Sequence, residues 1–253
     1  MRVRISAACG SHKGNVRENN EDAVYFHGKT LSGVEDDIQC LSKEFWFPGL
    51  LCFGVFDGMG GEDCGEIAAE SAVRDLGRCQ KHLREYAGKP EQFLLDACED
   101  MNAAVCRQMQ KLGVGRMGTT AALLLLTSSE AHCCNIGDSR IYRLREDDLT
   151  QCSKDHVMPQ MGGGKPRKMP LTQHLGIFPQ ELKLEPYLRK ERLHKGDVFL
   201  LCSDGLTDMV RDKEIKMWMQ MKRPPRERVE GLIRTALSNG GKDNVTVLLI
   251  DIH

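Results

Sequence analysis

One stretch of the sequence carries most of the information about the fold: Leu50-Leu-Cys-Phe-Gly-Val-Phe-Asp-Gly-Met-Gly-Gly61. Residues 50–56 form a nearly continuous apolar run between a glycine and an aspartate, which is typical of a buried strand. The Asp57-Gly58 pair that follows is a common hairpin turn. Because no alternating strand comes after it, we instead expect the chain to turn into a helix that begins near Glu62.

Other aspartates lie at similar strand ends. Asp138 and Asp204 follow apolar runs, and Asp243 immediately precedes the apolar run 245–252. A single aspartate at such a position is usually a turn residue or a helix cap. If these runs are central strands of packed sheets, however, their ends can meet at one rim.

Acidic side chains that meet at one rim would repel each other. The pair Glu21-Asp22, next to an expected strand, adds two more acids. Burying each unpaired charge costs several kcal/mol, and a multivalent cation is the simplest way to offset that cost. Oxygen ligands without a His/Cys set favour Mg²⁺ or Mn²⁺ over zinc.

The rest of the chain predicts alternating groups of strands and helices. The clearest helix covers residues 91–112, where apolar side chains recur on one face. We expect further helices and strands as follows: strands at 3–9, 23–26, 119–127, 131–136, 140–144, 182–189, 197–202 and 245–252, helices at 212–222 and 225–237, and a turn region or hairpin at 28–43. This order indicates an α+β fold in which helical hairpins cover antiparallel sheets, within a single domain, residues 1–253.

Composition limits the class of protein. The 253 residues are 41% hydrophobic and 28% charged with a net charge of −1, so nothing directs the chain to nucleic acid or an anionic membrane. The longest apolar run is too short to cross a bilayer, and residues 1–9 lack the apolar core of a secretory signal. The eleven cysteines contain no Cys-x-x-Cys pair. We therefore expect reduced thiols and a cytoplasmic location.

Six motifs in order resemble the motif set of the metal-dependent type 2C Ser/Thr protein phosphatases (the PPM family) in its compact bacterial form. Each motif is weak alone, but the six together span nearly the whole chain. They are Gly14-Asn-Val-Arg-Glu-Asn-Asn-Glu-Asp22, Phe56-Asp-Gly-Met-Gly-Gly61, Gly118-Thr-Thr-Ala121, Gly137-Asp-Ser-Arg140, Cys202-Ser-Asp-Gly-Leu206 and Lys242-Asp-Asn-Val-Thr246. The resemblance implies two packed antiparallel sheets flanked by helical pairs.

The resemblance also implies a role for each site residue. Two ions, Mn²⁺ or Mg²⁺, would be bridged by Asp57. The implied ligand set is completed by the Gly58 carbonyl, Asp204 and Asp243 on one side and Glu21 on the other, while Asp138 would support a weaker third ion together with Asp204. Asp22 would orient water and Arg17 would hold the substrate phosphate, because a guanidinium can donate to two phosphate oxygens at once.

The implied reaction is hydrolysis of phosphoserine or phosphothreonine in proteins by a water molecule that bridges the two ions. Paired cations lower the pKa of such a water and neutralise the phosphoryl oxygens. The one Cys-x5-Arg spacing, from Cys134 to Arg140, begins inside the apolar strand expected at 131–136, so we do not interpret it as the phosphate-binding loop of a covalent phosphoenzyme mechanism. The expected partners are phosphoproteins and, by analogy, a cognate Ser/Thr kinase.

The chain departs from the family pattern at two places. Many members carry histidine where this chain has Met59, and methionine cannot protonate a leaving alkoxide. His156 is a candidate for that role, against the alternatives of an exposed or structural histidine and of metal-bound water as the proton donor. The second departure is the segment 157–170, which is short, contains three consecutive glycines and is basic.

Three alternatives remain to be compared. A catalytically weak or silent regulatory module of the same fold would usually have lost a metal-binding acid, yet Asp57, Asp204 and Asp243 are all present. A two-metal nuclease would need a basic, aromatic-rich surface. A calcium-binding protein would need an Asp-x-Asp-x-Asp-Gly loop, which the sequence lacks.

Overall fold

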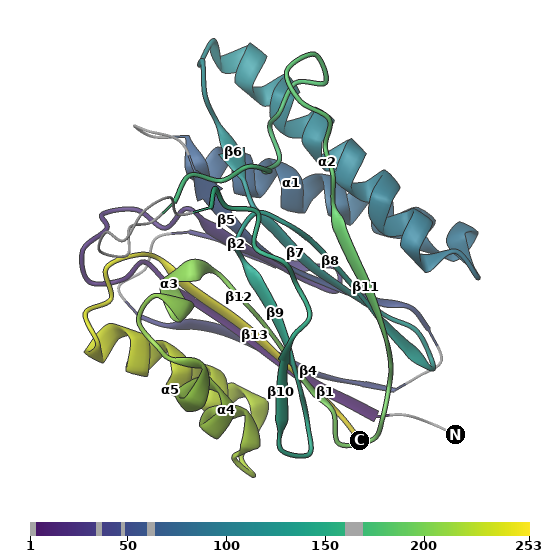
Figure 1. The fold of residues 1–253 in the computed structure, drawn as a ribbon, viewed down its shortest axis with the longest axis vertical. Coiled ribbons are helices and arrows are strands. Elements are labelled where there is room, and N and C mark those ends of the chain that lie inside the picture. The colour runs from purple at the N-terminus through teal and green to yellow at the C-terminus, as the bar shows by residue number, and fades with distance from the viewer. Residues whose placement is uncertain (1–3, 34–36, 47–48, 60–63, 160–168) are drawn as a thin grey trace.

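The computed structural model describes residues 4–33, 37–46, 49–59, 64–159 and 169–253. Two antiparallel β-sheets pack face to face, and helices cover the outer face of each sheet (Figure 1). The predicted α+β class with two packed antiparallel sheets is therefore confirmed.

The first sheet has the strand order β10-β9-β12-β13-β1-β4. Its strands are β1 (Arg4–His12), β4 (Gln39–Trp46), β9 (Arg140–Arg145), β10 (Asp148–Gln151), β12 (Val198–Cys202) and β13 (Val245–Ile252). The second sheet has the order β11-β8-β7-β5-β2-β3, with β6 paired to β5. Its strands are β2 (Asp22–Phe26), β3 (Lys29–Leu31), β5 (Leu51–Met59), β6 (Gly118–Thr119), β7 (Ala121–Leu126), β8 (Glu130–Ile136) and β11 (Tyr187–Arg192).

Two groups of helices form the outer layers. The described helices are α1 (Gly65–Cys79), the 3₁₀ helix η1 (Gln80–Tyr86), α2 (Pro90–Leu112), α3 (Asp204–Thr207), α4 (Asp212–Gln220) and α5 (Pro225–Ser238). The pair α1 and α2 buries its apolar faces on the second sheet, and α4 and α5 cover the first. None of these helices combines the length and apolar composition that crossing a bilayer requires.

The central position of strand β5 explains why its sequence is apolar on both faces. Residues 51–56 are all buried, because β5 lies between β2 and β7 with helices on one side and the other sheet beyond. The strand predicted at 50–56 is confirmed. The helix expected near Glu62 is α1, which begins at Gly65 in the described residues, whereas Glu62 itself lies outside them.

The strongest helix prediction is also confirmed. Helix α2 starts with a proline at its first position, where the missing backbone N–H costs nothing, and ends at Gly113 in the left-handed conformation. Both boundaries of the predicted helix at 91–112 follow from these terminal residues.

Other boundaries differ from the prediction. The region 28–43 contains β3, which forms a hairpin with β2 through the turn His27-Gly28, but also most of β4, which joins the opposite sheet beside β1. The strand predicted at 182–189 is displaced to β11, because its pairing with β8 begins only after Pro186. Strand β10 was not predicted, since its four residues carry little apolar pattern.

Three phenylalanines join the two sheets. The ring centroid of Phe45 on β4 lies 6.0 Å from that of Phe26 on β2 and 5.7 Å from that of Phe53 on β5. Phe53 is fully buried between the sheets. This cluster closes the end of the interior where the edge strand β4 lies.

We expect Phe53→Ala to lower the free energy of unfolding by about 3–5 kcal/mol, because the cavity left between the sheets cannot collapse. Urea denaturation followed by circular dichroism measures this loss. Trp46→Ala is the matched control, since that side chain is 65% exposed, and a change within about 0.5 kcal/mol is expected. Equal losses in the two variants would contradict the assigned core.

Candidate active site

Asp57 lies near the end of β5, directly opposite Asp22 in the register of β5 with β2. Its backbone is held from the other side by two threonines. The Asp57 N–H donates to Thr120 Oγ1 at 3.0 Å, and the Asp57 carbonyl accepts from Thr120 N–H at 2.9 Å and from Thr119 Oγ1 at 3.0 Å. Position and orientation of Asp57 are therefore set by the sheet.

Three of the predicted acids line one cavity of about 370 Å³. Asp57 comes from β5, Asp138 follows β8, and Asp204 is the first residue of α3, which begins two residues after the end of β12. The cavity is also lined by Met59 and Thr120 and by residues 169–171. Ends of strands from both sheets thus meet at one rim, as the sequence predicts.

Asp22 is buried beside this cavity. Its Oδ2 accepts a hydrogen bond from Ser203 Oγ at 2.7 Å. Burial is the main cause that raises the pKa of Asp22, hydrogen bonds from the hydroxyls of Thr246 and Ser203 lower it, and the negative charges of Asp204 and Asp243 raise it, which together place the pKa at about 7. The shift therefore reflects chiefly the burial of the Asp22 carboxyl group, with a smaller contribution from its acidic neighbours.

Glu21 contacts both β5 and the start of α1. Its carbonyl accepts from Gly58 N–H at 3.1 Å, and its carboxylate lies so close to Gly65 that a Cβ there would be 2.5 Å from Oε2. A Cβ on Gly58 would in turn clash with the Gly65 carbonyl. Two glycines are therefore needed for β5, α1 and Glu21 to approach one another.

Arg17 and Asp243 form a two-fold ion pair. Arg17 Nη2 lies 3.0 Å from Asp243 Oδ2, and Nε lies 3.0 Å from Oδ1. The hydrogen bond to Asp243 raises the pKa of Arg17. The Arg17 side chain is 54% exposed, so the guanidinium lies at the mouth of the site. Asp243 itself lies beside α3, because a Cβ on Gly205 would be 3.5 Å from Asp243 Cβ.

Asn244 attaches the loop that carries Arg17 to the start of β13. Its side-chain amide donates to the carbonyls of Lys13 and Asn19 at 2.8 and 2.7 Å, and its Oδ1 accepts from Glu21 N–H at 2.9 Å. Sequence reasoning assigned no role to Asn244, nor to Ser203. The sequence feature that could have indicated a role for these two residues is their position inside the Lys242–Thr246 and Cys202–Leu206 motifs.

His156 supports the turn that carries Asp138. The imidazole Nδ1 of His156 accepts a hydrogen bond from the Gly137 N–H at 3.1 Å. The backbone N–H of His156 donates to the Gly137 carbonyl at 3.0 Å. Burial lowers the pKa of His156, and the charge of Lys154 lowers it further. These contacts favour the structural alternative for His156. The glycines and basic residues of segment 157–170 lie at 160–168, outside the described residues.

The acids approach one another without closing into a tight cage. Among the described residues, no three of the site's carboxylates bring ligand atoms within 4.8 Å of one another. One of the carboxylates, Asp243, is engaged by Arg17. A cation that recruits Asp243 would therefore compete with this ion pair.

Comparison with known proteins gives the same assignment. A family model described as "Protein phosphatase 2C" matches residues 34–239. The serine/threonine phosphatase stp of Listeria innocua is 33% identical over 78% of this chain and 82% of that protein. PstP of Mycobacterium tuberculosis is 32% identical over 97% of this chain but only 44% of its own length, so this chain spans less than half of PstP.

Solved structures are similar over nearly the whole chain. The catalytic domain of PstP, solved in complex with two manganese ions, has a TM-score of 0.79 at 31% identity and 99% coverage of both chains. PppA, a regulatory component of the T6SS in Pseudomonas aeruginosa, has a TM-score of 0.77 at 29% identity and 98% coverage of both. The motifs, the fold and these relatives agree, and the chain belongs to the protein phosphatase 2C family of serine/threonine phosphatases.

Proposed function

We propose that this phosphatase holds two Mn²⁺ or Mg²⁺ ions at the rim where Asp57, Asp138 and Asp204 line one cavity. That convergence is the observation that carries the proposal. The acids present only oxygen donors, which fit hard divalent cations. The charges of Asp204 and Asp243 are among the causes that raise the pKa of the buried Asp22, and a cation at the rim would offset those charges. Two manganese ions in the PstP catalytic domain support the same number here.

The proposed ligands follow the geometry of the site. Asp57 lies at the centre, between Asp22 and the threonines, and is suited to bridging two ions. The remaining ligands would be the Gly58 carbonyl, Asp204, Asp243 and Glu21, with Asp138 and Asp204 beside a weaker third ion. Bound cations would supply Lewis-acid neutralisation of the phosphoryl oxygens and lower the pKa of water.

The chain's own residues would bind and orient the reactants. The Arg17 fork, which here matches the two oxygens of a carboxylate, presents the same donors to two oxygens of a phosphate. Asp22, fixed by Ser203, would orient the attacking water. No cysteine is among the described residues that line the cavity, which favours direct attack by water over a phosphocysteine intermediate.

We also propose that residues 1–253 form a single catalytic domain. The core between the sheets contains residues from both ends of the chain, including Ile5 and Ile252. All eleven cysteines are free thiols, which supports a cytoplasmic location. The expected partners are phosphoproteins and a cognate Ser/Thr kinase. The alternative, a catalytically silent module of this fold, is disfavoured because every metal-binding acid is retained.

Asp57→Asn should lower kcat/KM for para-nitrophenyl phosphate on the order of 100-fold or more, because transition-state charge loses its support. Wild-type activity should disappear in EDTA and return with Mn²⁺. Asp148→Asn is the control, since that carboxylate is 72% exposed on β10. Thermal unfolding adds a readout without turnover: Mn²⁺ should raise the Tm of the wild type and of the control, but not of Asp57→Asn. Full activity in the variant would place the site elsewhere.

Arg17→Lys should raise KM for a phosphoserine peptide about tenfold, because an ammonium cannot donate to two phosphate oxygens in a fork. The Mn²⁺ concentration for half-maximal activity should not rise, since the competing ion pair with Asp243 weakens. Steady-state kinetics at several Mn²⁺ concentrations separate these effects, with Arg226→Lys on α5 as the matched control. An unchanged KM would remove Arg17 from substrate binding.

Met59 lines the cavity but cannot donate a proton. We therefore expect kcat to be at least about tenfold higher for an aryl phosphate than for a phosphoserine peptide, since a general acid typically contributes about 100-fold or more for a poor leaving group. Met59→His should narrow this ratio, whereas Met59→Leu should leave it unchanged. Equal wild-type kcat values across leaving groups would refute the expectation.

A further inference from the structure

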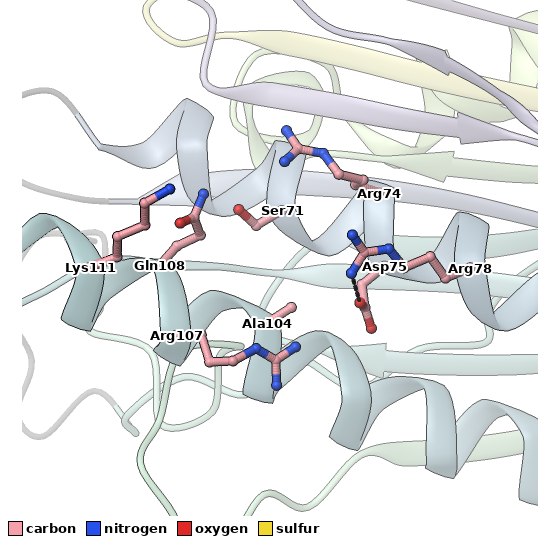
Figure 2. Close-up of a pocket in the computed structure, with 8 residues that line it drawn as sticks. All are labelled: Ser71, Arg74, Asp75, Arg78, Ala104, Arg107, Gln108 and Lys111. Carbon is pink, nitrogen blue, oxygen red and sulfur yellow. Dashed lines mark hydrogen bonds and ion pairs between the residues drawn. The ribbon is translucent and has the colours of Figure 1, made fainter.

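A basic groove lies between α1 and α2 (Figure 2), the two helices that cover the second sheet (Figure 1). Its volume is about 270 Å³. The residues that matter for its chemistry are Ser71, Arg74, Asp75 and Arg78 from α1 and Arg107 and Lys111 from α2. The α1 residues follow a spacing of three and four, which places them on one face of the helix.

Positive charge dominates this groove. Of the six side chains, four are cations and one is an acid. Asp75 is paired with Arg78 at 3.3 Å, and Arg74 lies 4.0 Å from Glu70. Within the described part of the chain, Arg107 and Lys111 make no ion pair. Burial raises the pKa of Asp75, and the charge of Asp100 raises it further, whereas the charges of Arg78 and Arg107 lower it.

Ser71 provides an independent sign of a ligand. It is only 5% exposed, and its hydroxyl oxygen is buried without a hydrogen-bond partner among the described residues. A buried polar atom left unsatisfied costs about 1–3 kcal/mol. Figure 2 shows Ser71 between Gln108 and Arg74, at the groove that the cations surround. Rotation of this side chain about χ1 would let the hydroxyl donate to acceptor oxygens that a ligand brings into the groove.

We propose that the groove is a non-catalytic binding site for a phosphate monoester dianion, carried by a phosphorylated serine or threonine of a protein substrate. Arginines donate in a fork to phosphate oxygens, and the volume suits one phosphorylated side chain. No aromatic ring is among the described residues that line it, so it offers no surface for stacking a nucleotide base. The identity of the ligand rests on the proposed function, since a phosphoprotein phosphatase meets multiply phosphorylated chains.

Fluorescence anisotropy with a labelled phosphoserine peptide tests the proposal. The full chain is used in EDTA, which stops hydrolysis and leaves the active-site carboxylates to repel the dianion. We expect saturable binding that weakens at least tenfold in the double variant Arg74→Gln/Arg107→Gln. The matched control Arg226→Gln/Arg234→Gln removes two arginines from α5 and should bind like the wild type. The unphosphorylated peptide should not bind.

Two further arms make the result specific. Ser71→Ala should weaken binding several-fold and leave the Tm unchanged, because the hydroxyl makes no internal hydrogen bond. A lowered Tm with unchanged binding would mean that Ser71 has a structural role, and it would overturn the ligand assignment. Inorganic phosphate should compete with the peptide. If phosphate binds but the phosphopeptide binds no better than its unphosphorylated form, the proposal is wrong.

Activity separates this proposal from the proposed function. Arg74→Gln/Arg107→Gln should hydrolyse para-nitrophenyl phosphate with wild-type kcat/KM, because neither arginine lines the catalytic cavity. Groove-dependent peptide binding by a protein without phosphatase activity would refute the function and retain the groove. Normal phosphatase activity together with equal peptide binding by the two double variants would support the proposed function and refute the groove as a binding site.

Discussion

Repulsion between carboxylates is the constraint on which this structure depends. Acids from β2, β5, β8, β12 and the start of β13 meet at one rim, where water cannot fully screen them. They remain there because the backbone holds them. Asp22 and Asp57 are fixed opposite each other by strand register, and Asp57 is held by Thr119 and Thr120. The apolar interior between the sheets provides the folding free energy that offsets this repulsion.

Two features of the site respond to the same constraint. Arg17 neutralises part of the charge by pairing with Asp243, and Glu21 lies at the start of α1, where the helix dipole favours a carboxylate. Both residues are in a loop that Asn244 attaches to the strand ends. The loop is therefore part of the electrostatic balance of the site. Helix α1 continues from this contact toward the basic groove, so its two ends present opposite charge environments.

Prediction from the sequence succeeded where one physical signal dominated. The buried strand β5 and the helix α2 have apolar patterns that are compatible with few other structures. Helix α2 is also bounded by Pro90 and Gly113, residues that are typical of helix ends. Prediction failed where the pattern was weak. Strand β10 is short and half-exposed, and β4 is assigned to its sheet by pairing with β1 rather than by its own residues. Strand β11 begins only after Pro186, because proline has no N–H to donate and the pairing with β8 starts at Tyr187.

The sequence by itself determined which acids end apolar strands, the order of the six motifs and the fold class that buries those strands. These follow from local composition, because apolar runs must be covered and Asp-Gly pairs interrupt them. Only the tertiary structure decided that Arg17 pairs with Asp243, that His156 holds the Gly137 turn and that Ser71 lies unsatisfied in a basic groove. Each of these depends on distances between residues far apart in the chain, and local sequence patterns contain no measure of such distances.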